Sequence, residues 1–280
     1  MRGCACHTTE GFAHVSCLAE QAKILVAKGE ENNLDYKAKN ERWGRWHTCG
    51  LCEQEYHGVV NCALGWACWK TYVGRPEANN VRSDTMNLLG LSLTESGHHE
   101  DALSVGEALL STMRRLGVPE DSEDLLIVKS NLSNTYYKVG RLEYALQMKR
   151  DVYSGRVKLS GEEHQDTLLA ANNCASSLNT HGRFEEAKSL LRKTMPVARR
   201  VLGENSNLTL RIRWVYAQTL CNDGGATLDD LREAVTTLEE AERTARRVYG
   251  SAHPLAREIE GFLRKSQTAL RAREESPGGA

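Results

Sequence analysis

The chain has 280 residues, and its 36 Lys and Arg nearly balance its 37 Asp and Glu. This balance argues against nucleic acid or a membrane surface as a partner, because both attract strongly basic proteins. No apolar run approaches the roughly 18 residues that a membrane-spanning helix needs, and we expect a soluble intracellular protein in the cytoplasm, with the nucleus not excluded. Ala, Leu, Glu and Arg are frequent, whereas Pro and Phe number five and three, which favours helix over sheet.

The cysteines are concentrated near the N-terminus, where seven of the nine lie within the first 68 residues. In an intracellular chain, such a cluster more often binds metal than forms disulfides. Two-residue gaps let paired ligands reach one zinc ion. His14 and Cys17 have this gap, as do Cys49 and Cys52, whereas one residue separates Cys4 from Cys6. These six residues are the candidate zinc ligands. The alternative is that they are ordinary buried thiols and a core histidine.

With its surrounding letters GFAHVSCLAE and WHTCGLCEQEYHG, this arrangement resembles the RING-CH (RING-variant) finger. The resemblance implies a partial finger over residues 1–58 with two cross-braced sites. Cys4, Cys6, Cys49 and Cys52 would complete one Zn²⁺ site, and His14 and Cys17 would form half of the other. The missing Cys-x-x-Cys pair should lie before Cys4, so either the chain starts too late or one metal site has been lost. The loop between Cys17 and Cys49 is long for the family, and residues 18–28 within it are expected to be helical.

RING-CH proteins are typically ubiquitin-protein ligases that bind a charged ubiquitin-conjugating enzyme and supply no nucleophile of their own. The resemblance therefore implies a docking surface around Trp46 and Leu51. The alternative is that Trp46 only packs the core of the finger. Residues 59–81 are expected to form a connecting helix, in which Cys62 and Cys68 are core residues rather than ligands.

The rest of the chain is periodic. Gly97, Gly140, Gly182 and Gly224 follow apolar helical segments at separations of 43, 42 and 42 residues. A small residue precedes each glycine by seven positions, and in the first three repeats an alanine follows it by five, which lets two helices approach closely while the glycine supplies the turn. The pattern predicts four helix pairs, at about 82–119, 124–165, 166–207 and 208–254. A capping helix at about 255–273 and a disordered tail at 274–280 are expected to follow.

Over residues 82–254 the chain resembles the tetratricopeptide repeat in its kinesin light chain-like form, as in GRLEYALQMKRDVYSGRVKLSGEEHQDT and GRFEEAKSLLRKTMPVARRVLGENSNLT. The expected fold is an all-α, tetratricopeptide-like superhelix of helical hairpins over 82–273, with a small irregular zinc-binding module at the N-terminus.

In such repeats the first helices line the inner surface of the superhelix. Placing the repeat register on this sequence brings a set of mostly carboxamide residues to that surface: Asn87, Asn134, Asn172, Asn179, Arg211, Gln218 and Asn222. A carboxamide both donates and accepts, so it can pair with a peptide backbone whatever the side chains are. The residues therefore predict a groove for a protein or peptide ligand. The alternative is that asparagine merely tolerates an exposed helix face.

Two functional classes remain open. In the first, the chain is a zinc-binding ubiquitin-protein ligase, or a ligase component, whose repeats recruit the substrate. In the second, it is a non-enzymatic adaptor with a degenerate finger.

Overall fold

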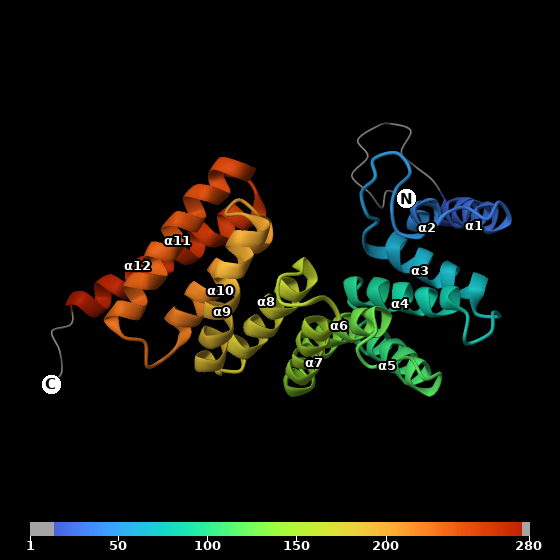
Figure 1. The fold of residues 1–280 in the computed structure, drawn as a ribbon. Helices are drawn as coiled ribbons and strands as arrows, with labels where there is room; N and C mark the ends of the chain where they lie inside the picture. The colour runs from blue at the N-terminus through green and yellow to red at the C-terminus, as the bar shows by residue number, and fades with distance from the viewer. Residues whose placement is uncertain (1–13, 276–280) are drawn as a thin grey trace. The chain divides into compact units, whose positions relative to one another are not determined.

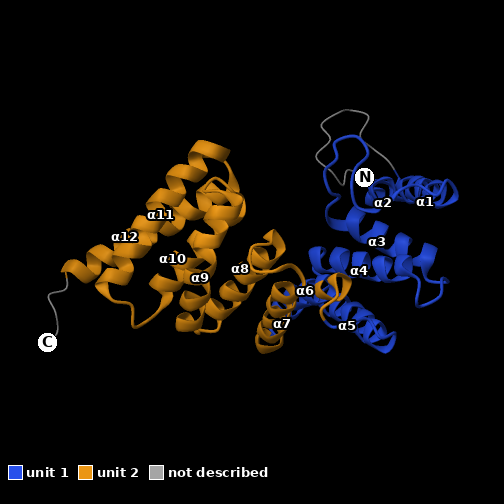
Figure 2. Cartoon of the chain, in the orientation of Figure 1, with its two compact units in different colours: residues 1–120, 127–141 blue, residues 121–126, 142–280 orange. Residues whose placement is uncertain are grey.

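The structure is a computed structural model that describes residues 14–275. Within this range it contains helices and no β-strand, apart from an isolated antiparallel bridge between Thr48 and Glu55. The predicted all-α class is confirmed. None of the described helices is long and apolar enough to cross a membrane. The chain divides into two compact units, residues 1–120 with 127–141 and residues 121–126 with 142–280, and each unit is described by itself (Figure 2).

Unit 1 contains the first five α-helices and most of the sixth (Figure 1). Two of these helices start at capping side chains: Asp35 accepts from the N–H of Ala38, and Asn79 accepts from that of Val81. The elements are α1 (Val15–Glu31), α2 (Tyr36–Trp43), the 3-10 helix η1 (Gly44–Trp46), α3 (Gly58–Tyr72), α4 (Asn80–Glu95), α5 (His99–Arg115) and α6 (Glu123–Lys138).

The N-terminal helices share a hydrophobic core with the first repeat. Trp46 lies edge-on to the ring of Tyr72, at 6.0 Å between centroids, and both pack in one cluster with Ala22, Cys68 and Leu88. That cluster joins α1, η1, α3 and α4. The described part of the expected irregular module is therefore largely helical, and its core is continuous with that of α3 and α4.

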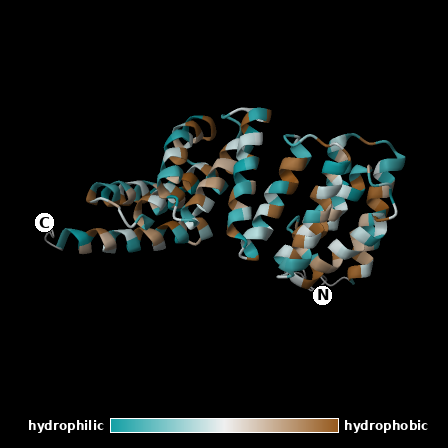
Figure 3. Ribbon diagram, turned by 90° about the horizontal axis from the view of Figure 1, so that it is seen from below, coloured by the Kyte–Doolittle hydropathy of each residue, from teal (hydrophilic) through white to brown (hydrophobic). Residues whose placement is uncertain are grey.

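Unit 2 starts with the first four residues of α6 and continues through six further helices. From α7 onward each helix packs against the next, and α10 also contacts α8 and the capping helix α12. Figure 3 shows hydrophobic and hydrophilic positions alternating along the helices, as expected where each helix buries one face. The helices are α7 (Leu142–Ser160), α8 (Gln165–Thr180), α9 (Phe184–Leu202), α10 (Asn207–Asn222), α11 (Leu228–Tyr249) and α12 (Pro254–Glu275).

The turn inside each of the first three helix pairs is a Schellman motif centred on the predicted glycine. Gly97, Gly140 and Gly182 have φ values of 83°, 78° and 69°, which favour glycine. The residue after each glycine donates its N–H to the carbonyl five positions back, as His98 does to Leu93 over 2.9 Å. The prediction that glycine supplies the turn is confirmed at these three positions.

The fourth turn is built differently. Gly224 does not have a positive φ; instead, the Asp223 carboxylate accepts from the N–H of Gly225, and Thr227 forms a capping box with Asp230 at the start of α11. The turn is longer here, so the chain reverses direction over several residues and needs no left-handed glycine.

The predicted small residues lie at helix–helix contacts. Every one of them is buried except the partly buried Gly90; the buried ones are Ser133, Ala175 and Ala217 before the turns and Ala102, Ala145, Ala187 and Ala234 after them. A Cβ on Gly90 would lie 4.0 Å from the carbonyl oxygen of Ala102, so the backbones of α4 and α5 come close at this point.

Candidate functional site on the first helices of the repeats

In unit 1, the first helices of two repeats are joined by matched polar side chains. The Asn131 amide on α6 donates to Oδ1 of Asn87 on α4 over 3.0 Å. The hydroxyls of Thr94 and Thr135 lie 3.2 Å apart on the same two helices. Because a carboxamide has two donors and an acceptor with two lone pairs, this bond fixes both groups and leaves the NH₂ of Asn87 and the carbonyl of Asn131 able to bind a ligand.

A cavity of about 110 Å³ lies beside this asparagine pair. Its walls come from α4, α5 and α6 and are mostly apolar, with Leu91, Leu109 and Leu132 among them. Asn134 is exposed and also lines the cavity. The unit thus combines an apolar floor with amide groups, as sites that bind peptides and small ligands commonly do.

In unit 2, α8 and α10 have a second amide pair. Nδ2 of Asn222 donates to Oδ1 of Asn179 over 3.3 Å. Gln218 is half-buried on α10, and the exposed Arg211 donates from Nε to Oδ1 of Asn207 over 2.8 Å. Of the predicted carboxamides, Asn179 and Asn222 therefore form a pair between neighbouring first helices.

Oδ1 of Asn172 and Nε1 of Trp214 are among the buried polar atoms of unit 2 that have no hydrogen-bond partner within the described part of the chain. Asn172 is only 7% exposed. The two residues occupy the same register position, ten residues before Gly182 and Gly224, on helices that contact each other. An unsatisfied buried polar group costs about 1–3 kcal/mol, so an internal water that bonds to these atoms would stabilise unit 2.

Of the seven predicted groove residues, Asn87 and Asn134 lie in unit 1 and the other five lie in unit 2. The prediction omitted Asn131, although this residue makes the bond to Asn87. Its separation of 44 residues from Asn87, close to one repeat, is the sequence signal that identifies it.

In the N-terminal segment, Cys49 and Cys52 lie in a tight turn. The N–H of Leu51 points to Sγ of Cys49 at 3.5 Å, and the N–H of Glu53 donates to the Cys49 carbonyl over 3.1 Å. Glu53 has a φ of 57°, a conformation uncommon for residues other than glycine. A backbone N–H directed at sulfur stabilises a thiolate, the form of cysteine that binds metal.

The other predicted ligands are less completely placed. Cys4 and Cys6 lie outside the described residues. His14 and Cys17 are exposed at the start of α1, where Val15 and Leu18 pack against the hydrophobic cluster that contains Cys49. Across residues 14–275, no group of three or more His, Cys, Asp or Glu side chains is arranged to hold a metal ion. A Zn²⁺ site therefore stays a prediction that depends on Cys4 and Cys6.

The two predicted docking residues differ in exposure. Leu51 is 79% exposed, whereas Trp46 is completely buried in the core described above. The placement of Trp46 fits the alternative that it packs the core, and only Leu51 is available to a partner. Cys68 is buried as predicted, and burial raises the pKa of its thiol, so it is not a reactive group. Cys62 packs against a neighbouring cluster.

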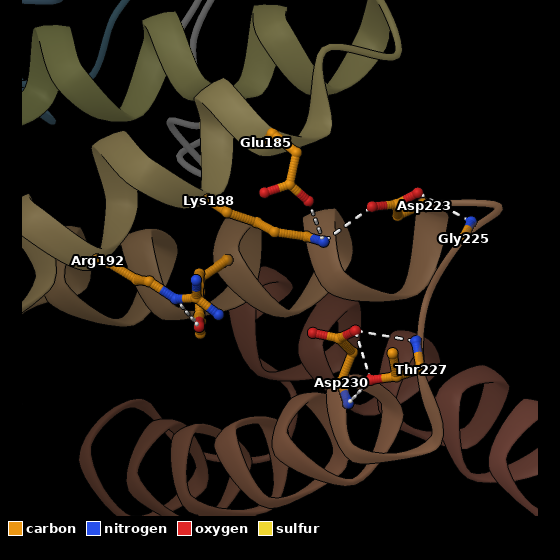
Figure 4. A network of polar contacts seen from close by, with 8 residues as sticks. Glu185, Lys188, Arg192, Asp223, Gly225, Thr227 and Asp230 are labelled. Carbon is orange, nitrogen blue, oxygen red and sulfur yellow. Dashed lines mark hydrogen bonds and ion pairs between the residues drawn. The ribbon is translucent and has the colours of Figure 1, made fainter.

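The charged residues of unit 2 form a network where α9 meets the end of α10 (Figure 4). Nζ of Lys188 lies 2.8 Å from the carboxylate of Asp223 and 2.9 Å from that of Glu185. Burial acts to lower the pKa of Lys188, but the hydrogen bonds to both carboxylates outweigh this effect and raise the pKa. The same ammonium, with the N–H of Gly225, holds the pKa of Asp223 below its usual range. These groups are all paired, which indicates a structural role.

Residues 124–200 match the family model of the tetratricopeptide repeat. This segment of the chain therefore consists of tetratricopeptide repeats. A curated relative, the Clustered mitochondria protein homolog of Yarrowia lipolytica (strain CLIB 122 / E 150), is 30% identical over 118 residues, which make up 41% of this chain and 10% of the relative. The matched region thus spans about a tenth of that relative's length.

Solved structures support the same fold. The chain is similar to a protein of Podosopora anserina described as a kinesin light chain with nearly identical TPR-like repeats, with a TM-score of 0.57 and 16% identity over 85% of this chain and 99% of that one. A single-substitution variant of that protein gives a TM-score of 0.57 and 16% identity, over 84% and 98% of the two chains. These likenesses show a kinesin light chain-like tetratricopeptide fold.

Proposed function

We propose that the tetratricopeptide repeats bind an extended peptide segment of a partner protein along their first helices. The observation that carries the proposal is the hydrogen-bonded asparagine pair of unit 1, Asn87 and Asn131, beside an apolar cavity. An extended peptide presents N–H and C=O groups along its length, and oriented carboxamides satisfy both.

The amide pair of unit 2, Asn179 and Asn222, supports the proposal independently. The apolar residues beside the asparagine pair of unit 1 would contribute the non-directional part of the affinity when they are covered.

The test starts from peptides selected on the full chain from a random display library. Their dissociation constants are measured by fluorescence polarisation for the wild type, Asn87→Ala and Asn134→Ala. A hydrogen bond contributes about 0.5–1.5 kcal/mol, so we expect each substitution to weaken binding about two- to tenfold. Asn40→Ala, an exposed asparagine of α2, is the matched control and should leave binding unchanged. Unchanged binding in both groove variants would contradict the proposal.

A second candidate function concerns the N-terminal segment. We propose that Cys49 and Cys52 bind Zn²⁺ together with Cys4 and Cys6, which the amide-to-sulfur contact in the Cys49 turn supports. Zinc per chain would be measured by mass spectrometry in wild type, in Cys49→Ser and in the control Cys221→Ser. The thiol of Cys221 lies in unit 2, where it donates a hydrogen bond to the hydroxyl of Ser266. We expect bound zinc that only Cys49→Ser loses. Wild type without zinc, or zinc retained by Cys49→Ser, counts against this site.

A zinc finger of this kind would allow a ubiquitin-conjugating enzyme to dock at Leu51, so that the chain would act as a ubiquitin-protein ligase with substrate held by the repeats. Self-ubiquitination with a panel of conjugating enzymes tests this activity, with Leu51→Arg expected to abolish it. Val59→Arg, at another highly exposed apolar residue, is the control. No activity with any enzyme favours the alternative, a non-enzymatic adaptor.

A further inference from the structure

A second cavity of unit 1, of about 220 Å³, lies between the N-terminal segment and the first helix of the first repeat. Its floor is formed by Leu88 and Leu91 of α4, and its walls include the ring of Trp43 and the imidazole of His47. Cavities of about 150 Å³ already accommodate a benzene-sized ligand, so this one has room for a long side chain.

The cavity is strongly acidic. Asp84, Glu95 and Glu55 line it, and its lining includes no lysine or arginine. Glu95 is held in place by Nδ2 of the buried Asn61.

These carboxylates are not arranged for a metal ion, since no such group of three is found within residues 14–275. They share the cavity with the half-buried indole of Trp43. A guanidinium suits this geometry because it is planar, stacks on aromatic rings and donates to several carboxylates at once.

The acidic cavity adjoins the cavity beside the asparagine pair, because both are lined by Asn87, Leu91 and Glu95. A peptide whose backbone lies against Asn87 can therefore place one side chain in the cavity that Trp43 lines. We infer that this cavity binds an arginine side chain of the partner, so that the repeats recognise a peptide with an arginine anchor. The inference rests on the peptide-binding function proposed above.

The probe is Nα-acetyl-L-arginine N-methylamide, titrated into the ¹⁵N-labelled full chain. The chain has five tryptophans, and the indole N–H signal of Trp43, assigned with Trp43→Phe, reports on the cavity. A ligand of this size should bind with a Kd on the order of 1 mM. The citrulline analogue is nearly isosteric and uncharged, and it should bind at least about tenfold more weakly, since hydrogen bonds between charged groups are about twice as strong as neutral ones.

Glu55→Gln/Glu95→Gln should also weaken binding of the arginine probe about tenfold, by removing two of the three charges around the cavity. Glu100→Gln, an exposed acid of α5, is the matched control and should not change it. The inference is overturned if no saturable shift occurs up to about 20 mM probe, about twenty times the expected Kd. It is also overturned if citrulline binds equally well or the double variant binds like wild type. The titrations of Asn87→Ala and Asn134→Ala use selected peptides, whereas this experiment uses the arginine probe alone. The groove proposal can therefore be contradicted while the cavity still binds arginine, and the cavity proposal can be contradicted while the groove still binds peptides.

Discussion

Replacing Asp223 by alanine tests how the ends of the repeats are fixed in unit 2. The side chain of Lys188 is only 6% exposed, and it contacts two carboxylates, those of Asp223 and Glu185. The side chain of Glu185 is 82% exposed and that of Asp223 is 21% exposed. Asp223→Ala therefore leaves the buried ammonium of Lys188 with only the solvent-exposed carboxylate of Glu185 as a partner.

The expected cost follows from these exposures. A hydrogen bond to a charged group contributes about 1.5–3 kcal/mol, and the bond from the exposed Gly225 N–H adds less than about 1 kcal/mol because water replaces it. We therefore expect Asp223→Ala to lower the free energy of unfolding by about 2–3 kcal/mol. Lys188→Met keeps the aliphatic stem and leaves a carboxylate that water can reach, so its cost should be below about 1 kcal/mol.

The assay is urea unfolding followed by circular dichroism at 222 nm for wild type, both single variants and the double variant. The double-mutant cycle formed by these four proteins should give a coupling energy of about 1.5–2 kcal/mol between Lys188 and Asp223. Asp229→Ala, which removes a highly exposed acid on α11, is the control and should cost less than about 0.5 kcal/mol. A coupling energy near zero, or Lys188→Met costing more than Asp223→Ala, would refute the reasoning.

Three further predictions concern stability. In Gly155→Ala the new Cβ would lie 2.5 Å from Cδ2 of the buried Leu126, so we expect a loss of about 1–2 kcal/mol in urea unfolding, whereas Gly261→Ala, with open space around it, should gain about 0.5–1 kcal/mol. Leu191→Ala empties a fully buried site, so we expect it to lower the free energy of unfolding by more than about 2 kcal/mol. A smaller loss would show that the neighbouring side chains collapse into the cavity. Hydrogen bonds from Arg114 and Lys129 lower the pKa of Glu120 to about 2, so its contribution to stability is present above pH 4.5 and disappears as the pH falls toward 2. Glu120→Gln should flatten the pH dependence of the free energy of unfolding in that range, and an unchanged curve would contradict the assignment.

The repeats could be predicted from the sequence because their determinants are local. A left-handed turn requires glycine, and close helices require small residues, so Gly97 and Ala102 recur one repeat later as Gly140 and Ala145. Gly224 shows where this reasoning fails. A glycine in register does not establish the turn type, because Asp223 and the capping box of Thr227 fix a longer turn by other means.

The N-terminal segment was predicted less well because its contacts do not repeat. The sequence leaves Trp46 open between a docking surface, which the finger resemblance implies, and the core. The ring packs against Tyr72, which lies 26 residues further along the chain. The contact of Lys188 with Asp223 was missed for the same reason. Both residues look like surface charges in the sequence, and only the packing of α9 against α10 brings them together.

The division between periodic and non-periodic contacts also suggests how recognition is distributed. Unit 2 also has an amide pair, Asn179–Asn222, at another position in the repeat, so both units offer carboxamides that can bind a peptide backbone. Such chemistry gives affinity with little choice among peptide sequences, because every peptide has the same backbone. The acidic cavity is made by contacts that occur once, between the N-terminal segment and α4. Choice among partners should therefore depend on this cavity. Peptides selected on wild type should contain an arginine at a fixed position, and those selected on Glu55→Gln/Glu95→Gln should not. If the peptides selected on wild type lack this arginine, another part of the surface determines which peptides bind.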